Sequence, residues 1–263
     1  EADRMLDMGF IRDVRKILAK LPEDRQSLLF SATMPAEVVK LSHDMLYEPE
    51  RIDIAPKTIA VEAIRQAVHF VNAKEKQSLL RELLGDKDMK RVIVFTRTKH
   101  RANRVADNLV KAGVEAAAIH GNKSQAARQK ALDAFRNGRV RVLVATDIAA
   151  RGIDVKDITH VINFELPNEA ESYVHRIGRT ARAGSEGVAL SFCDDTEYGE
   201  LKDIEKLIGR PVDTASGERP LHAAAKAPRG GRQGKWAGNK GGQQGRSGGQ
   251  KRRSGRRPSR RAA

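Results

Sequence analysis

Cysteine is nearly absent from this sequence, since Cys193 is the only one in 263 residues. No disulfide can therefore form within the chain, and no cysteine cluster can bind a metal. We expect Cys193 to be a small buried hydrophobic side chain. Long apolar runs are also missing: none approaches the roughly 20 residues that cross a bilayer, and no basic-then-apolar signal segment opens the sequence. These absences predict a cytoplasmic protein without membrane contact.

Acidic residues are scarce in one region. The formal net charge is +15, but residues 211–263 hold 14 Lys and Arg against 2 Asp and Glu, whereas the preceding residues hold 35 against 32. Residues 210–263 are also rich in Gly, Arg, Gln and Ser and poor in apolar side chains, which predicts a disordered basic tail. Such a tail attracts a polyanion by releasing its counterions, and nucleic acid is the commonest one. The alternative is a tail that only keeps the protein soluble.

Residues 65–209 alternate strand-like and helix-like patterns. The continuous apolar run Val92–Phe95 suits a central parallel strand that is covered on both faces. We expect further strands at 66–71, 114–119, 140–145, 159–163 and 187–192, with helices between them and a closing helix at 197–207. Repeated βα units predict an α/β fold with a doubly wound parallel sheet.

Residues 1–54 form a separate block with a different pattern. Helices are expected at 11–20 and 36–46, and strands at 27–30 and 51–54. Two strands are too few for a sheet of this class, because its unpaired edges and apolar faces would be exposed. We therefore interpret the block as the C-terminal remnant of a larger first domain, joined to the second by a linker at 55–64.

Loops that follow the carboxyl ends of parallel strands are the usual ligand sites of open sheets. Small hydroxyl, glycine and basic groups at these positions let donors approach phosphate oxygens closely. Four predicted loops share this character, at Thr96-Arg97-Thr98, His120-Gly121, Thr146-Asp147 and Asn163-Phe164. Each loop taken singly is equally compatible with an ordinary surface loop.

The segment His175–Arg182 holds three arginines, and no acidic residue lies between Tyr173 and Gly184 to neutralise them. This pattern indicates an external anionic partner. Arg179 and Arg182 are three residues apart, so on a helix they would share a face and could converge on one phosphate group. That arrangement is typical of arginine fingers in phosphoryl transfer. The alternative is that these arginines pair with distant carboxylates of the same chain.

Four motifs, in the family's order, resemble those of DEAD-box ATP-dependent RNA helicases. Glu1-Ala2-Asp3 resembles the end of the DEAD motif, and Ser31-Ala32-Thr33 resembles the SAT motif. Val144–Asp154 is similar to motif V, and His175–Arg182 is similar to motif VI. The resemblance covers residues 1–209, and Arg4–Phe10 together with the basic tail resembles the bacterial RhlE-type subgroup.

This resemblance implies two RecA-like domains that close over ATP and bend one RNA strand. Residues 1–54 would end the first, ATP-binding domain, 65–209 would be the complete second domain, and 210–263 would be the tail. ATP and Mg²⁺ would then be the ligands of the complete enzyme, and RNA its substrate. Association with ribosome-assembly or RNA-degradation machinery would also fit this subgroup.

Residue roles follow from the resemblance by position. Glu1 would be the general base that orients the attacking water, and Asp3 would link the magnesium site to the second domain. Ser31 and Thr33 would couple the two halves of the cleft, and His175 would bridge toward the first-domain motifs.

In the second domain the resemblance places Asp154 at the ATP ribose. Arg179 and Arg182 would contact the γ-phosphate in the closed state. The residues near the RNA sugar-phosphate backbone would be Thr96, Arg97, Gly121, Gln125, Arg128 and Thr146.

Two departures from the family pattern bear on activity. Ala181 stands where many members have Gly, a change that we expect to preserve a helix and the arginine spacing. No Gly-x-x-x-x-Gly-Lys-Ser/Thr loop occurs in the sequence. We therefore expect ATP hydrolysis from a longer protein and none from these 263 residues alone. The alternatives are a nucleotide-independent module that binds or anneals RNA, and DNA in place of RNA as the substrate.

Overall fold

The computed structural model describes residues 2–7, 9–31, 33–53, 64–150, 153, 155–181 and 186–220. By contacts the chain divides into two units, Glu1–Ala225 and Lys226–Ala263, and the second lies wholly outside the described residues. Among the predicted site residues, Glu1, Asp154 and Arg182 also lie outside them, as do residues 55–63 of the predicted linker.

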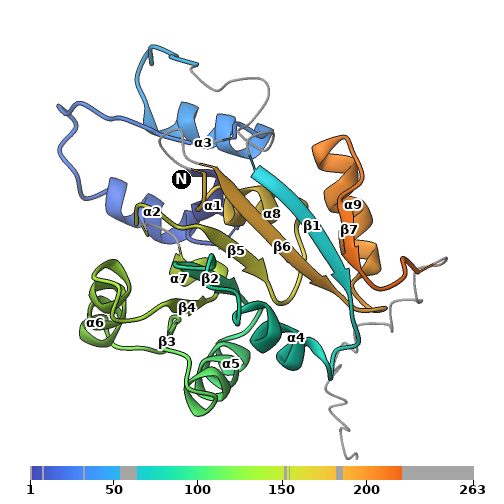
Figure 1. Cartoon of the computed structure of the whole chain (residues 1–263). Helices are drawn as coiled ribbons and strands as arrows, with labels where there is room; N and C mark the ends of the chain where they lie inside the picture. Colours follow the sequence, from blue (N-terminus) through green and yellow to red (C-terminus); the bar gives the residue numbers. More distant parts are fainter. Residues whose placement is uncertain are drawn as a thin grey trace, which may run out of the picture. The chain divides into compact units, whose positions relative to one another are not determined.

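Seven parallel strands form a single sheet, in the order β3-β4-β2-β5-β6-β1-β7. Figure 1 shows the helices that connect them. The α/β fold with a parallel sheet is therefore confirmed, and the central position of β2 with it. The strands are β1 (Ile64–Phe70), β2 (Val92–Phe95), β3 (Ala116–Ile119), β4 (Val142–Ala145), β5 (His160–Asn163), β6 (Gly187–Cys193) and β7 (Asp213–Ser216).

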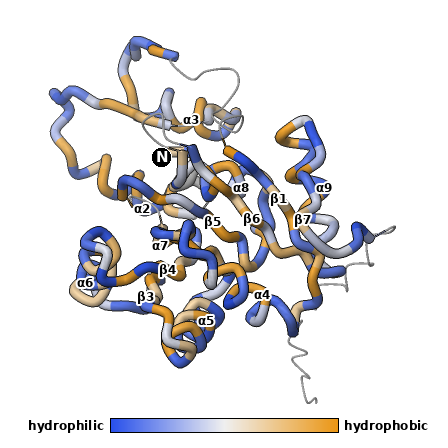
Figure 2. The backbone as a smooth tube through the Cα atoms, in the orientation of Figure 1, coloured by the Kyte–Doolittle hydropathy of each residue, from blue (hydrophilic) through white to orange (hydrophobic). Residues whose placement is uncertain are grey.

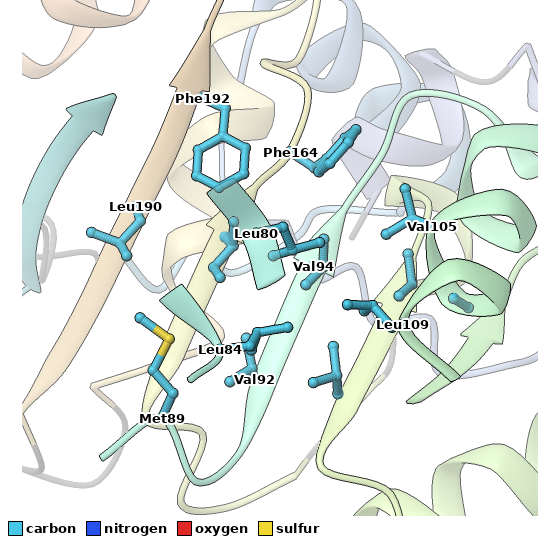
Figure 3. Packing of buried hydrophobic residues seen from close by; sticks show 14 of the residues in the cluster. Leu80, Leu84, Met89, Val92, Val94, Val105, Leu109, Phe164, Leu190 and Phe192 are labelled. Carbon is cyan, nitrogen blue, oxygen red and sulfur yellow. The ribbon is translucent and has the colours of Figure 1, made fainter. Parts of the chain in front are cut away.

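Helices cover both faces of the sheet. Successive side chains of a strand point to opposite faces, so apolar residues on each face have helices to pack against. Val92 and Val94 of β2 pack with helices α4 (Lys76–Leu83) and α5 (Lys99–Lys111). In Figure 3 these two valines lie between Leu80 and Leu84 on one side and Val105 and Leu109 on the other.

The alternate residues of β2, Ile93 and Phe95, belong to the opposite face. They pack with α6 (Gln125–Arg136) and the short α7 (Asp147–Ala150). Helices α8 (Ala170–Ile177) and α9 (Tyr198–Ile208) cover the part of the sheet that contains β1 and β6. In Figure 2 hydrophobic residues recur along the strands, whereas α5 and α6 contain both hydrophobic and hydrophilic residues.

Strand β7 extends the sheet beyond the predicted boundary. Asp213 and Thr214 pair with Ala67 and Val68 of β1, and Arg219 makes a bidentate ion pair with Glu205 of α9 at 2.9 and 3.0 Å. The tail was expected to begin at residue 210, which is too early. The four residues of β7 are all exposed and give no apolar pattern, so the sequence did not predict the strand. Its stability comes from pairing with β1 and not from burial.

Cys193 is 1% exposed, which confirms its prediction as a buried hydrophobic residue. Burial raises the pKa of its thiol to about 12, so the side chain stays protonated at neutral pH. None of the helices in the described ranges combines the length and the apolar character that a membrane span requires.

Residues 2–53 contain three helices and, where they are described, no strand. The helices are α1 (Ala2–Asp7), α2 (Ile11–Leu18) and α3 (Ala36–Met45). The strand predicted at 27–30 is therefore wrong, and so is the one predicted at 51–54 as far as its described residues 51–53. A strand needs a neighbouring strand to pair with, and residues 27–30 lie beside helix α1, whose Ala2 N–H donates to the Phe30 carbonyl at 3.1 Å.

Candidate functional site

The carboxyl ends of four neighbouring strands lie in register at one edge of the sheet. Ala145 of β4 is paired with both Phe95 of β2 and Ile119 of β3, and Phe95 is also paired with Asn163 of β5. Backbone bonds continue the alignment past the strands, since Thr96 N–H donates to the Ala145 carbonyl at 3.0 Å. The four loops singled out in the sequence therefore lie together at this edge.

Two helices begin at this edge with capped N-termini. The Thr98 hydroxyl accepts a hydrogen bond from the Arg101 N–H at 3.2 Å, and the Ser124 hydroxyl accepts one from the Ala127 N–H at 3.2 Å. Helix N-termini carry a partial positive charge and attract phosphate groups. Gln125, the first residue of α6, is exposed. Arg128 lies one turn later, and its buried Nε has no hydrogen-bond partner among the described residues.

His120 joins the loop before Gly121 to helix α5. Its Nε2 donates to Asn103 Oδ1 at 2.9 Å, while its Nδ1 accepts from the Asn122 N–H at 3.3 Å. Burial lowers the pKa of His120, and the nearby Lys123 and Lys99 lower it further. Lys99 also donates to Asn122 Oδ1 at 3.0 Å, so the loops after β2 and β3 are tied together. The neutral histidine thus serves as a structural link between them.

Arg97, predicted to lie near RNA, is held by several groups of its own domain. Its N–H donates to Glu165 Oε2 at 2.9 Å, and its Nε donates to the Leu166 carbonyl at 2.5 Å. Its Nη2 lies 3.3 Å from Glu197 Oε1, an ion pair whose N–H is not aligned for a hydrogen bond. The side chain keeps 27% of its surface exposed. The loop is therefore fixed, and the side chain still faces solvent in part.

A buried ionic cluster lies behind Arg97. Lys76, which is 2% exposed, contacts Glu197, 2% exposed, and lies 3.2 Å from Asp194. Burial raises the pKa of Glu197, and the ammonium of Lys76 opposes that shift. Glu197 also accepts from the Leu166 N–H at 3.2 Å. The cluster ties α4 and the start of α9 to the segment that holds Arg97.

Arg176 pairs within the chain and needs no external partner. Its guanidinium makes two hydrogen bonds to Asp147, at 2.6 and 2.8 Å, and donates to Asn163 Oδ1 at 3.1 Å. It is 2% exposed and lies over the Phe95 ring, 5.1 Å from the centroid. The prediction that all three arginines of motif VI bind an external anion is therefore wrong for Arg176. The pairing could not be predicted from the local sequence, because Asp147 is 29 residues away in the chain.

Helix α8 ends at Ile177, so Arg179 follows the helix and does not lie on it. His175 is in the last turn, and its carbonyl accepts from Arg179 Nε at 3.2 Å; the Ile153 carbonyl accepts from Arg179 Nη1 at 3.3 Å. Ala181 has a left-handed φ of 52°. The expectation that Ala181 preserves a helix through the arginines is thus wrong, because the helix stops before them. Thr146 and Arg179 lie near the same edge of the sheet, because Asp147, which follows Thr146, accepts a hydrogen bond from Arg176, three residues before Arg179.

Three predicted residues of the N-terminal block meet in one hydrogen-bonded cluster. The Asp3 N–H donates to Ser31 Oγ at 3.1 Å, and the Thr33 hydroxyl donates to Asp3 Oδ2 at 2.7 Å. Ser31 Oγ in turn donates to the Thr33 carbonyl at 2.7 Å. Asp3 is 5% exposed. Among the described residues no group of three or more His, Cys, Asp or Glu side chains is arranged to hold a metal ion.

Sequence reasoning gave no ordering role to the carboxylates of the site, although Asp147 lay in one of the predicted loops. Asp147 and Glu165 each lie within two residues of a strand end, and that position was a usable signal. Glu197 begins a helix far along the chain, and no local pattern marks it as a partner of Lys76.

Two family models match the chain. Residues 75–184 match the helicase conserved C-terminal domain, and residues 1–41 match the DEAD/DEAH box helicase domain. The chain is 45% identical over 213 residues to the DEAD-box ATP-dependent RNA helicase CshA of Bacillus cereus, and 44% identical over 214 residues to the ATP-dependent RNA helicase RhlB of Pseudomonas syringae. Each match covers 81% of this chain, but 41% of CshA and 54% of RhlB, so the chain spans about half the length of these relatives.

Solved structures agree with this relationship. A structure of the E. coli DEAD-box protein SrmB bound to regulator of ribonuclease activity A matches with a TM-score of 0.56 and 37% identity, covering 61% of this chain and 95% of that one. S. cerevisiae Dbp5 bound to RNA and ADP BeF3 matches with a TM-score of 0.73 and 33% identity, covering 82% of this chain and 57% of that one.

The fold and the site thus define a RecA-like helicase domain, with basic loops at the carboxyl edge of a parallel sheet. Since both family models and the relatives agree with the order of the motifs, the chain belongs to the DEAD-box helicase family.

Proposed function

We propose that this chain is the C-terminal part of an ATP-dependent RNA helicase, in which RNA-stimulated ATP hydrolysis drives local remodelling of RNA duplexes. The observation that carries the proposal is the in-register edge of β3, β4, β2 and β5. It brings four loops, two capped helix N-termini and the motif VI segment together. RNA would lie along the β3–β4–β2 side, and nucleotide would lie toward Arg179.

RNA binding would use mainly backbone contacts. Helix N-termini and the positive side chains near them suit phosphate oxygens and read no base sequence. The contacts would come from Thr96, Arg97, Gly121, Gln125, Arg128 and Thr146. Two relatives support RNA as the partner: CshA is named an RNA helicase, and Dbp5 was solved with RNA and ADP BeF3.

Nucleotide chemistry would be shared between the two parts of the chain. Arg179 and Arg182 would stabilise negative charge on the γ-phosphate, and Asp154 would accept hydrogen bonds from the ribose. Glu1 would orient the attacking water, while Asp3, Ser31 and Thr33 would transmit closure of the cleft, as would His175. The hydrogen bonds among Asp3, Ser31 and Thr33 are consistent with their acting as a unit.

Mg²⁺ would be bound only indirectly by this chain. The ion typically takes one or two carboxylates together with phosphate oxygens and water, and Asp3 would be the carboxylate that orders such water. Bound Mg²⁺ would neutralise charge on the phosphates during transfer. We further propose a cytoplasmic, RhlE-type protein. Association with ribosome-assembly or RNA-degradation machinery is proposed as well, and the structure of SrmB bound to regulator of ribonuclease activity A supports the second setting.

The deciding experiment compares RNA-stimulated ATP hydrolysis of the 263-residue chain with that of the chain extended upstream through a phosphate-binding loop. Hydrolysis by the extended chain alone is expected. RNA binding without hydrolysis in either would instead favour the nucleotide-independent binding or annealing module. A DNA strand of the same sequence that stimulates equally would overturn RNA as the specific substrate.

Within the extended chain, Arg179→Ala should lower RNA-stimulated turnover by about 10²- to 10³-fold, as expected for loss of one transition-state donor. Arg139→Ala is the matched control, because Arg139 is exposed near the start of β4, at the opposite edge of the sheet. Equal turnover in the two variants would refute the assignment of Arg179.

The tail is tested by removing residues 221–263. A cut at 210 would also remove β7 and disturb the sheet, so the later boundary is required. RNA affinity should fall and its salt dependence should flatten, because fewer counterions are released. Some RNA-stimulated hydrolysis should remain, and its complete loss would show that the tail is more than a tether.

A further inference from the structure

The segment from Asn163, the last residue of β5, to Leu166 lies between the two arginines that organise this edge of the sheet. Asn163 Oδ1 and the Glu165 carbonyl both accept hydrogen bonds from Arg176 Nη1, at 3.1 and 2.7 Å. The Leu166 carbonyl accepts from Arg97 Nε. The segment therefore contacts motif VI through Asn163 and Glu165, and the loop after β2 through Leu166.

Glu165 is the member of this segment whose side chain reaches toward the loop after β2. Its Oε2 accepts from the Arg97 N–H at 2.9 Å, and its Oε1 lies 3.3 Å from Arg101 Nε as the acceptor of a second bond. The side chain is 16% exposed. Because both oxygens have donors on the same loop and helix, the orientation of the carboxylate is fixed. Removal of the carboxylate would leave the Arg97 N–H without this acceptor, and because β2 ends at Phe95, no strand pairing replaces it.

Glu165 is itself held in place by its backbone. Its carbonyl accepts from Arg176, whose guanidinium is clamped by the two oxygens of Asp147. A chain of hydrogen bonds thus runs from Asp147 through Arg176 and Glu165 to Arg97. In Figure 1 the strands β4, β5 and β2, which these residues follow, lie side by side in the sheet.

We propose that Glu165 is a positioning residue for RNA: it bonds the backbone N–H of Arg97 and so places the Arg97 loop, with its side chain, in the geometry that accepts the RNA backbone. This inference rests on the proposed function. Glu165 touches no RNA in this role and acts through Arg97. The hydrogen-bond chain orders the loop already in the absence of RNA, so RNA binding does not have to supply the free energy of ordering it.

The charge of Glu165 makes the proposal separable from simple electrostatics. Replacing a carboxylate beside a phosphate-binding edge with a neutral amide removes a repulsion, so electrostatics alone predicts tighter RNA binding. Loss of positioning predicts weaker binding. The two explanations therefore predict opposite signs for the same substitution.

The test is Glu165→Gln in the extended chain, measured as ATP turnover against RNA concentration. Glutamine keeps the shape of the side chain, but its NH₂ group replaces one carboxylate oxygen. A donor then faces a donor where the carboxylate oxygen was an acceptor. The half-saturating RNA concentration should rise about tenfold, which is the effect of one lost charge-assisted hydrogen bond. Turnover at saturating RNA should stay within about twofold, because the contact serves binding and not the chemical step.

Glu171→Gln is the matched control, since it makes the same charge change six residues away on an exposed side chain of α8. A rise in half-saturating RNA for Glu165→Gln, with none for Glu171→Gln, supports the proposal. Equal behaviour of the two variants, or tighter binding by Glu165→Gln, overturns it while leaving the proposed function intact. A parent protein without RNA-stimulated hydrolysis overturns both.

A double-mutant cycle with Arg97→Ala keeps the test decisive if one variant is destabilised. When Glu165 acts through Arg97, adding Glu165→Gln to Arg97→Ala should change the half-saturating RNA concentration by less than about twofold, so the effects are not additive. Fully additive effects would contradict the proposal. Thermal unfolding of each variant verifies that the compared proteins are folded at the assay temperature.

Discussion

Phe30 and Phe95 end two similar apolar runs, and their surroundings differ completely. Phe95 ends β2 and is 1% exposed, whereas Phe30 lies in the N-terminal block and is 75% exposed. Elsewhere in residues 2–53, Tyr47 and Ile52 are 90% and 83% exposed. A hydrophobic run thus becomes a buried strand only where partner strands and helices lie on both its faces.

Polar contacts differ between the two regions in the same way, with one exception. Arg176 is buried against Asp147 in the sheet domain, whereas Arg15 and Asp44 of the N-terminal block form an exposed pair at 2.9 Å. The exception is the cluster of Asp3, Ser31 and Thr33, which is organised although the nearby Leu28 and Phe30 are exposed. Local hydrogen bonds therefore maintain a polar site beside exposed apolar side chains.

The strongest way to break this comparison is to remove one phenylalanine from each region. Phe135→Ala deletes a fully buried ring of the α6 face and should lower the free energy of unfolding by about 3–5 kcal/mol. Phe30→Ala, at a mostly exposed ring, should change it by less than about 0.5 kcal/mol. Urea unfolding of the 263-residue chain measures both, and similar losses would show that Phe30 is buried in solution.

The second contrast uses the two ion pairs. Arg176→Ala leaves Asp147 and Asn163 without their donor and should cost about 3 kcal/mol, the lower end for a buried pair because Asp147 is 34% exposed. Arg15→Ala breaks the exposed pair and should cost between about 0 and 1 kcal/mol. The midpoint of urea unfolding reports the difference. A cost for Arg176→Ala below that of Arg15→Ala would contradict the role given to the buried network.

A smaller effect concerns the pH dependence of the sheet domain. Burial lowers the pKa of His69, His120 and His160 below the ordinary value of 6.5. The unfolded chain therefore binds more protons than the folded chain as the pH falls below 6.5, and the free energy of unfolding decreases in that direction. Each histidine contributes at most about 1.4 kcal/mol per pH unit.

His69 is suited to testing this dependence, since it is 8% exposed and packs edge-on against Phe192. His69→Gln should flatten the decline in unfolding free energy between pH 6.5 and 5.5, although it lowers the value at pH 7.5. Urea unfolding at the three pH values measures the slope. An unchanged slope would mean that His69 titrates alike in the folded and unfolded chains.

The smallest expected effect lies where α8 gives way to an irregular turn. Ala181→Gly should raise the free energy of unfolding by about 0.5 kcal/mol, because relief of the left-handed backbone exceeds the added entropy of the unfolded chain. Ala134→Gly within α6 should lower it by about 1 kcal/mol. Opposite signs are the expected outcome of thermal unfolding, and a loss in both would place Ala181 in ordinary helical backbone.

Much of the fold could be predicted from the pattern of apolar residues. Strand β2 was predicted with its observed ends, because a fully buried strand leaves a continuous apolar run, and β5 and β6 were predicted to within one residue. The edge strand β7 could not be found in this way, since its four residues are polar and exposed. The strand predicted at 27–30 failed for the opposite reason, because an apolar run was present and a partner strand was not.

For the site, the sequence by itself determined which residue types lie at the strand ends and in what order the motifs follow one another. Only the tertiary structure decided which charges are already neutralised. Arg176 was predicted to bind an external anion, and it is paired with Asp147 from another loop. The guanidinium of Arg97 forms an ion pair with Glu197, 100 residues away along the chain, while its backbone N–H donates to Glu165, 68 residues away. Parallel strands bring distant loops to one edge, so charge partners there depend on register in the sheet and not on separation along the chain.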